Sequence, residues 1–424
     1  MTSTAQAASP ARSPTRSIAL LAVAGFAAQA QVRVTDSLLP QIATDFNTTV
    51  GAAAMVVTAY AVAHGTIQLI IGPVADRFGK YRTVATMCAI GMVLVALCGT
   101  AATLHELALV RLATGAAAGW IIPISMAYVG DVTPYQLRQP ILARYLTGQI
   151  LGQLSGQAGG GILGDLVGWR NVFFVLAGVF ALATIGLVFE LITNPLTRAP
   201  RQPHETTRGF AADYAAVLRS HFARVVIIAA FIEGALVWGA FAYIGAHLHS
   251  RFGLSFTLIG LTVGCFGLGG LMFAAMVKLL VYCLGQFGLA VSGGFMIAAA
   301  YVEFALTPVW WLAPVATTAI GLGFYMLHNT LQTNATQMTP EARGTAVAVF
   351  SSAIFVGQTA GVGLGSLLID LTGAVPLFLG TAVATPILAI WFAGQLRHRP
   401  LVCVADTSAA SEVPELESAT AVLI

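Results

Sequence analysis

Long apolar runs alternate with short polar breaks along this chain, and the runs are about as long as a bilayer is thick. A helix needs about 20 mostly apolar residues to cross the hydrocarbon core of a membrane. The pattern therefore predicts an all-α membrane protein. We expect twelve transmembrane helices, at residues 17–42, 51–74, 82–101, 104–130, 140–163, 170–193, 224–247, 255–282, 286–306, 309–336, 344–369 and 374–396.

Composition supports the same class. Of the 424 residues, 57% are apolar and 9% are charged, whereas soluble domains carry about 25% charged residues. This excludes a soluble enzyme, a nucleic-acid binder and a disordered chain, and makes the lipid bilayer the main partner of the surface. The five cysteines show no metal-ligand spacing, so we expect no metal and no cofactor.

One long polar stretch divides the predicted helices into six and six. The resulting organisation is a disordered N-terminus, a first bundle, a linker, a second bundle and a tail, at residues 1–16, 17–193, 194–223, 224–396 and 397–424. The apolar run after Arg16 is too long for a signal peptide and lacks a clear cleavage site. We therefore expect it to remain as the first span.

Basic residues indicate the orientation. With both termini inside, sixteen Lys and Arg residues lie on the cytoplasmic side and two, Arg170 and Arg251, lie outside. Cytoplasmic loops of membrane proteins carry this excess of positive charge. We predict a multi-pass protein of the cell (inner) membrane with cytoplasmic N- and C-termini.

The two halves share an internal repeat. An offset of 205 residues aligns rare polar residues as well as glycines, pairing Arg138 with Arg343, Gln153 with Gln358, Asp165 with Asp370 and Gly168 with Gly373. Repeats of this kind in transporters place the substrate site at their interface near the midplane. The alternative is that the glycines only reflect close helix packing.

The polar break after the second span carries a charged motif, Gly72-Pro-Val-Ala-Asp76-Arg77-Phe-Gly79-Lys80-Tyr-Arg82. In this motif, in helix count and in its half-repeat, the chain resembles the major facilitator superfamily. The resemblance implies two pseudo-symmetric six-helix bundles. It also implies a latch that stabilises the outward-facing state, formed by Gly72, Asp76, Arg77, Gly79 and Lys80.

Two further stretches are similar to family motifs. Arg111 with Gly115 matches the fourth-helix pattern, whose arginine is linked to proton transfer in many antiporters. The glycine-rich fifth span is similar to the motif of antiporting exporters, but Gln157 stands where that motif has proline. The departure leaves two interpretations open, an antiporter motif or simple helix packing.

Charged residues inside spans are functional candidates, because a charge in the bilayer is costly. Arg33 and Asp36 lie on one helix face, so Asp36 is either a titrating carboxylate or part of a fixed ion pair. Glu233 has no basic neighbour within a turn and lies near Trp238 and Tyr243. We expect proton coupling at Glu233, Asp36 or Arg111, with Glu233 as the carrier.

Polar side chains at helical spacing predict a substrate cavity. His328 and Gln332 share one face of the tenth span, and aromatic residues adjoin them. Polar groups beside aromatic rings are typical of small-molecule sites, although hydrogen bonds between helices would use the same residues. The cavity candidates are Arg33, Gln153, Gln358, His328, Gln332, Trp238, Tyr243 and His64.

No phosphate-binding loop, nucleophile motif or metal box is present in the sequence. We therefore expect a monomeric, ion-driven transporter rather than an enzyme. The preferred hypothesis is proton-coupled export of small amphipathic, drug-like compounds by alternating access; the alternative is proton-linked uptake or exchange of a small organic acid. A sensor without turnover would need a larger soluble domain, and a membrane enzyme would need a nucleophile and a base that converge.

Overall fold

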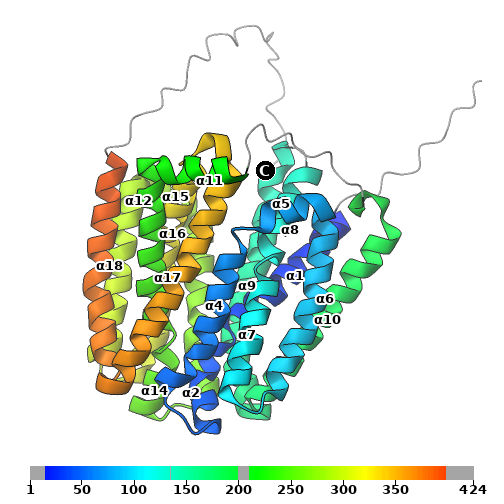
Figure 1. Ribbon diagram of the computed structural model, residues 1–424. Helices are drawn as coiled ribbons and strands as arrows, with labels where there is room; N and C mark the ends of the chain where they lie inside the picture. Colours follow the sequence, from blue (N-terminus) through cyan, green and yellow to red (C-terminus); the bar gives the residue numbers. More distant parts are fainter. Residues whose placement is uncertain (1–14, 134, 199–209, 398–424) are drawn as a thin grey trace, which may run out of the picture.

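The computed structural model describes residues 15–133, 135–198 and 210–397, and these contain helices but no strand. The predicted N-terminus and tail, and the middle of the predicted linker, therefore lie largely outside the described residues. For description, the N-terminal half runs to α10 and the C-terminal half begins at α11 (Figure 1). The N-terminal half contains α1 (Thr15–Arg33), α2 (Thr35–Asp45), α3 (Val50–Ala53), α4 (Met55–Ile67), α5 (Ile71–Phe78), α6 (Lys80–Thr100), α7 (Leu104–Ala118), α8 (Ile121–Val132), α9 (Tyr135–Val167) and α10 (Trp169–Thr193).

A short 3-10 turn, η1 (Pro195–Thr197), follows α10. The C-terminal half then contains α11 (Phe210–Arg219), α12 (His221–Glu233), the π-helical turn η2 (Gly234–Trp238), α13 (Gly239–Phe241), α14 (Ile244–Phe252), α15 (Phe256–Leu306), η3 (Trp310–Leu312), α16 (Ala313–Ala335), η4 (Pro340–Ala342), α17 (Arg343–Thr372) and α18 (Ala374–Arg397).

Several spans are broken, and this changes the helix count. By length and apolar composition, nine helices of the described chain are able to cross a membrane, or ten when α1 and α2, bent by 44°, form one span. Gly285, with φ of 59°, interrupts α15, which therefore covers two predicted spans. The long α9 covers one more predicted span but is not among the nine.

The helices stand side by side in a bundle, and the halves meet along two pairs of long helices (Figure 1). In one pair α9 packs on α15, and in the other α4 packs on α17. Outward-facing side chains are apolar, with Leu182 70% and Leu371 82% exposed. A surface of this kind suits lipid rather than water.

Packing inside the two halves follows the repeat. A Cβ on Gly152 would lie 2.4 Å from the carbonyl oxygen of Phe26, and one on Gly357 would lie 2.0 Å from that of Phe231. Both residues of the first contact are 205 positions before those of the second. Only glycine permits these backbones to approach so closely. The repeated glycines therefore make equivalent helix contacts in both halves.

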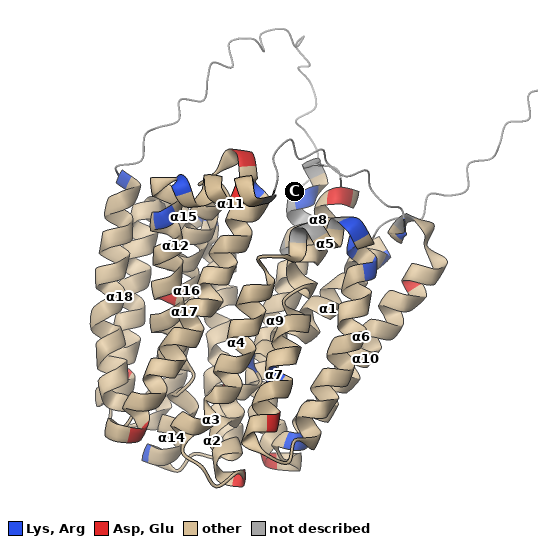
Figure 2. Ribbon diagram, viewed as in Figure 1, with Lys and Arg blue, Asp and Glu red and all other residues tan. Residues whose placement is uncertain are grey.

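Charge is distributed unevenly between the ends of the bundle. Most Lys and Arg residues lie at the end where α5 and α11 are found, here called the α11 end (Figure 2). At the opposite end, here called the α14 end, α2 and α14 lie together with Arg170 and Arg251.

Candidate functional site

The bend between α1 and α2 holds the charged residues of the first span. Arg33 ends α1 and Asp36 lies in the first turn of α2, with 4.0 Å between Arg33 Nη1 and Asp36 Oδ2. The side-chain amide of Gln157 donates to Asp36 Oδ2 at 3.2 Å. Arg33 and Asp36 are 6% and 2% exposed. Asp36 is thus held between a cation and an amide and is closed off from water.

Gln157 is a site residue that sequence reasoning missed. It occupies the position where the exporter motif has proline, and this departure was the available signal. A proline there would have no side-chain donor for Asp36. The glycines Gly152 and Gly156, one turn apart, pack on α1, which brings Gln157 against the bend.

Arg111 on α7 is completely buried and ties three helices of the N-terminal half together. Its Nε donates to the carbonyl of Val56 at 3.3 Å, and its Nη1 donates to that of Gln31 at 3.2 Å. The guanidinium carbon also lies 4.2 Å from the centre of the Tyr60 ring. Backbone carbonyls and a π-face stabilise this charge, and the ion pairs found among the described residues include Arg33 with Asp36 but not Arg111 with Asp36.

In the C-terminal half, the carboxylate is Glu233, the last residue of α12. It is 0% exposed, and its Oε2 lies 2.9 Å from Nδ1 of His328 on α16. Its other oxygen has no hydrogen-bond partner among the residues that the structure describes. The sequence offered no basic neighbour for Glu233, and the fold supplies an imidazole from 95 residues away. Two separately predicted candidates are therefore one pair.

Exposure along this face of α16 rises toward the α11 end. Phe324 is 6% exposed, the His328 side chain is 17% exposed, and Gln332 is exposed. These three residues are four positions apart and share one helix face. His328 therefore connects the fully buried Glu233 with a more accessible surface.

Arg33 and Trp238 join the halves at the centre. The guanidinium carbon of Arg33 lies 3.3 Å from the centre of the Trp238 ring, a cation–π stack. Trp238 ends η2, and π-helical turns are frequent at functional sites. Its ring centre is 4.9 Å from Phe266 and 5.0 Å from Phe324. This aromatic group adjoins the His328 side chain, which stacks on Phe324.

The other cavity candidates are dispersed. His64 lies 4.2 Å from the Phe355 ring, across the contact between α4 and α17. Gln153 and Gln358 are buried, and no hydrogen bond joins them within the part of the chain that is described. Tyr243 donates to the carbonyl of Val362 at 2.7 Å, so its hydroxyl is used in helix packing.

The predicted latch lies at the α11 end, around the start of α6. Gly79, with φ of 87°, makes the turn between α5 and α6, and Arg77 is exposed. Lys80 pairs with Asp131 at 2.7 Å within the N-terminal half. Gly72 lies in α5, and the side chain of Asp76 is outside the described parts.

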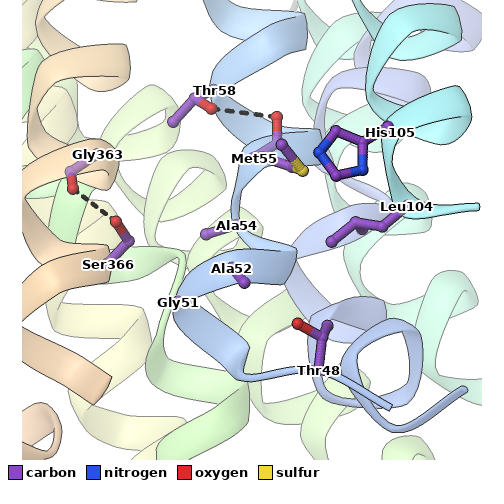
Figure 3. A pocket seen from close by; sticks show the side chains of 10 residues that line it. All are labelled: Thr48, Gly51, Ala52, Ala54, Met55, Thr58, Leu104, His105, Gly363 and Ser366. Carbon is purple, nitrogen blue, oxygen red and sulfur yellow. Dashed lines mark hydrogen bonds between the residues drawn. The ribbon is translucent and has the colours of Figure 1, made fainter. Parts of the chain in front are cut away.

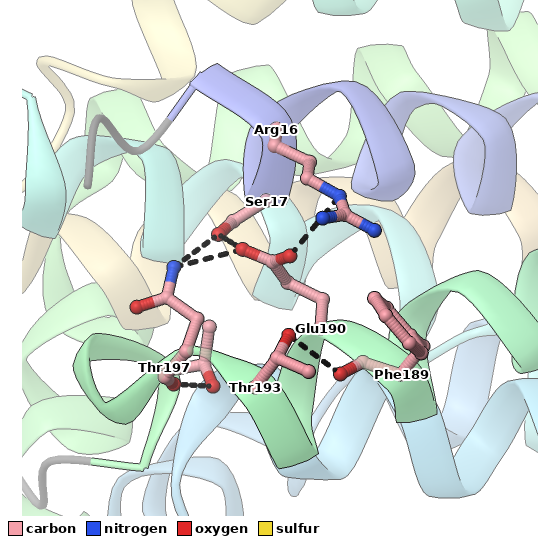
Figure 4. A network of polar contacts seen from close by, with 7 residues as sticks. Arg16, Ser17, Phe189, Glu190, Thr193 and Thr197 are labelled. Carbon is pink, nitrogen blue, oxygen red and sulfur yellow. Dashed lines mark hydrogen bonds and ion pairs between the residues drawn. The ribbon is translucent and has the colours of Figure 1, made fainter.

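A polar network that the sequence did not suggest lies at the α11 end of the N-terminal half (Figure 4). The buried Glu190 accepts from Ser17 and from Asn194, both at 2.8 Å, and lies 3.3 Å from Nε of Arg16. It ties the start of α1 to the end of α10.

A cavity of about 380 Å³ opens at the α14 end, away from the central charges (Figure 3). Its lining comes from both halves and includes Met55, His105 and Ser366. None of the predicted cavity residues lines it. Within the described ranges, no three His, Cys, Asp or Glu side chains are grouped to hold a metal ion.

Comparison with known sequences gives a consistent result. The family model described as Major Facilitator Superfamily matches residues 21–341. The chain is 25% identical over 350 residues to the uncharacterized MFS-type transporter YceJ of Bacillus subtilis (strain 168), covering 80% of this chain and 87% of that protein. It is 28% identical over 183 residues to the multidrug export protein EmrB of Haemophilus influenzae, covering 43% and 36% of the two chains.

Solved structures show the same fold. A bacterial homologue of the human lysosomal transporter Spinster, described as inward-facing and unoccupied, superposes with a TM-score of 0.67 at 17% identity, covering 90% of this chain and 96% of that chain. A mutant of the nucleoside transporter NupG superposes with a TM-score of 0.73 at 13% identity, covering 89% and 98%.

Proposed function

The chain belongs to the Major Facilitator Superfamily, and we propose that this transporter exports small amphipathic compounds in exchange for protons. The two halves rock about a central site and expose it to one side of the membrane at a time. The α11 end is cytoplasmic, which agrees with the excess of Lys and Arg there. The protein works as a monomer in the cell membrane.

The observation that carries this proposal is the pairing of Glu233 with His328. With one proton between them the pair is neutral or an internal ion pair, and with two it carries a positive charge. Each additional proton thus changes the net charge of a buried site by one, which makes substrate binding and proton binding compete. The increasing exposure toward Gln332 gives the proton a route to the α11 end.

The nature of the cargo follows from the surroundings of this pair. Trp238, Phe266 and Phe324 form an aromatic group beside His328, the partner of the carboxylate, and rings with few polar groups suit an amphipathic compound. The names of two relatives, multidrug export protein EmrB and efflux pump radE, agree with export.

Proton-linked uptake or exchange of a small organic acid is the second candidate. One observation favours it: within the described ranges of the chain, the Nε atom of the buried Arg33 has no hydrogen-bond partner. A substrate carboxylate would accept a hydrogen bond from this Nε atom. Arg111 is less suited to this role, since backbone carbonyls occupy its Nε and Nη1 atoms.

Flux into proteoliposomes under an imposed pH gradient separates the two candidates. A chemically mixed panel of amphipathic cations, neutral aromatics and small organic acids is offered, and uphill movement is measured with the gradient in each direction. Export by exchange predicts movement of amphipathic compounds against the proton flow. Movement of organic acids alone, in the same direction as protons, would contradict export by exchange and support the second candidate.

A further inference from the structure

Asp370 links the halves at the α14 end. It lies near the end of α17, and its Oδ1 accepts from the backbone N–H of Gly51 at 3.0 Å. Its Oδ2 accepts from the hydroxyl of Thr49 at 2.7 Å, while that hydroxyl accepts from the N–H of Ala52. Both contacts are at the first turn of the span Val50–Ile67. A carboxylate of one half therefore caps a helix of the other.

Asp165 makes the corresponding contact in the reverse direction. It lies near the end of α9, and its Oδ1 accepts from the N–H of Phe256 at 3.2 Å. Its Oδ2 accepts from the N–H of Thr257 at 2.5 Å. These are the first two residues of α15. The first N–H groups of a helix have no partner within it, and they favour an anion.

The two contacts are copies of one arrangement. Asp165 and Gly51 lie 205 residues before Asp370 and Phe256, so the repeat relates carboxylate to carboxylate and helix start to helix start. Each aspartate also lies two residues before the last residue of its own helix. An anion there opposes the dipole of its own helix, and the compensating stabilisation comes from the opposite half.

The neighbouring backbones limit these contacts to one arrangement of the halves. A Cβ on Gly51 would lie 2.5 Å from the carbonyl oxygen of Ser366, and one on Gly161 would lie 2.2 Å from that of Phe256. The carboxylates reach the helix starts because the helices touch there. When the halves part at the α14 end, both contacts are lost together and water takes over the exposed groups.

We infer that Asp165 and Asp370 form a two-part clamp that stabilises the conformation closed at the α14 end. Its open and closed forms differ in four hydrogen bonds to carboxylate oxygens. The Asp370 part contains a hydroxyl donor and the Asp165 part contains two backbone donors. Thr49 therefore offers a way to weaken one part alone.

The test measures the opening of the α14 end directly. Ala102 and Ser250 are exposed at this end in different halves. Spin labels are attached through Ala102→Cys and Ser250→Cys in a background without native cysteines. Asp165→Asn or Asp370→Asn is expected to raise the ratio of open to closed molecules about threefold to tenfold, because each change removes one accepting oxygen and the negative charge at a helix start. The double variant should approach the product of the two effects, because the sites are separate.

Asp45→Asn is the matched control. Asp45 is also an exposed carboxylate at the α14 end, but its partners Trp169 and Arg170 belong to the same half. Its replacement should leave the distance distribution unchanged. An unchanged distribution in the Asp165/Asp370 double variant would overturn the clamp, as would an equal shift in the control.

Thr49→Val keeps the test decisive if an aspartate variant does not fold. It removes one donor to Asp370 and the cap of its own helix, and should raise the open fraction by less than Asp370→Asn does. An open fraction unchanged from wild type would contradict the clamp. All distances are measured without substrate or pH gradient. The result for the clamp is therefore independent of whether the proposal of proton coupling is correct.

Discussion

Each half of the transporter buries one carboxylate near the centre, and the two are surrounded differently. Asp36 lies between the permanently charged Arg33 and the amide of Gln157, with 2% of its surface exposed. Glu233 instead faces the imidazole of His328, whose Nδ1 lies 2.9 Å from its Oε2. In our proposal the carboxylate beside the imidazole carries the proton, and the carboxylate beside the fixed cation has a structural role.

The largest effect expected from this difference is on coupling. Glu233→Gln should abolish uphill, proton-driven transport, because no carboxylate remains beside His328 to change its charge. Binding and downhill exchange of substrate should persist and lose their pH dependence. Flux and binding in proteoliposomes at several pH values measure both properties.

Asp36→Asn is the matched comparison, since it also replaces a buried carboxylate by its amide. It should lower the amount of folded protein by leaving Arg33 without its ion pair, while uphill transport continues in the molecules that fold. If uphill transport survived in Glu233→Gln and vanished in Asp36→Asn, the roles of the two halves would be exchanged.

Water access gives an effect of intermediate size. In a background without native cysteines, Gln332→Cys should react with a small hydrophilic thiol reagent about tenfold faster or more than Gln153→Cys, since opening of the packed interior limits labelling of a buried site. Reagent added from the α11 side measures the rates. Equal rates would mean that the C-terminal half has no special route to water.

The smallest effect concerns the stack that joins the two regions. A double-mutant cycle of Arg33→Lys and Trp238→Phe should give a coupling of about 0.5–1 kcal/mol in the free energy of unfolding in detergent. The smaller ring and the ammonium group each weaken the stack seen at 3.3 Å. Additive losses would show that the two side chains are neighbours without a specific interaction.

The sequence predicted the fold because the main features are local. Apolar runs predict spans, whereas the equivalent contacts made by Gly152 and Gly357 became visible only in the structure. The breaks were harder to foresee. The 44° bend follows Arg33, six residues before Pro40, and the π-helical turn at Gly234–Trp238 has no proline. The two breaks meet where Arg33 contacts Trp238.

The sequence named the candidate residues one by one but not the contacts between them. Glu233 and His328 were both candidates, yet their contact spans 95 residues of sequence, and no periodicity within one helix reveals it. The Arg33–Asp36 pair could be inferred from the sequence because its members are three positions apart on one helix face. Gln157 was noticed only as a departure from a motif, because a hydrogen bond across two helices depends on how closely their backbones approach.

The stack of Arg33 on Trp238 also constrains how such a molecule can arise from a duplicated half. The two residues are 205 positions apart and occupy equivalent places in the repeat. Two identical copies would bring arginine against arginine at this point, and the like charges would repel in a medium of low dielectric constant. A symmetric ancestor would therefore have needed an uncharged residue there, and the arginine of the first half could be accommodated only after the two copies had diverged at this position.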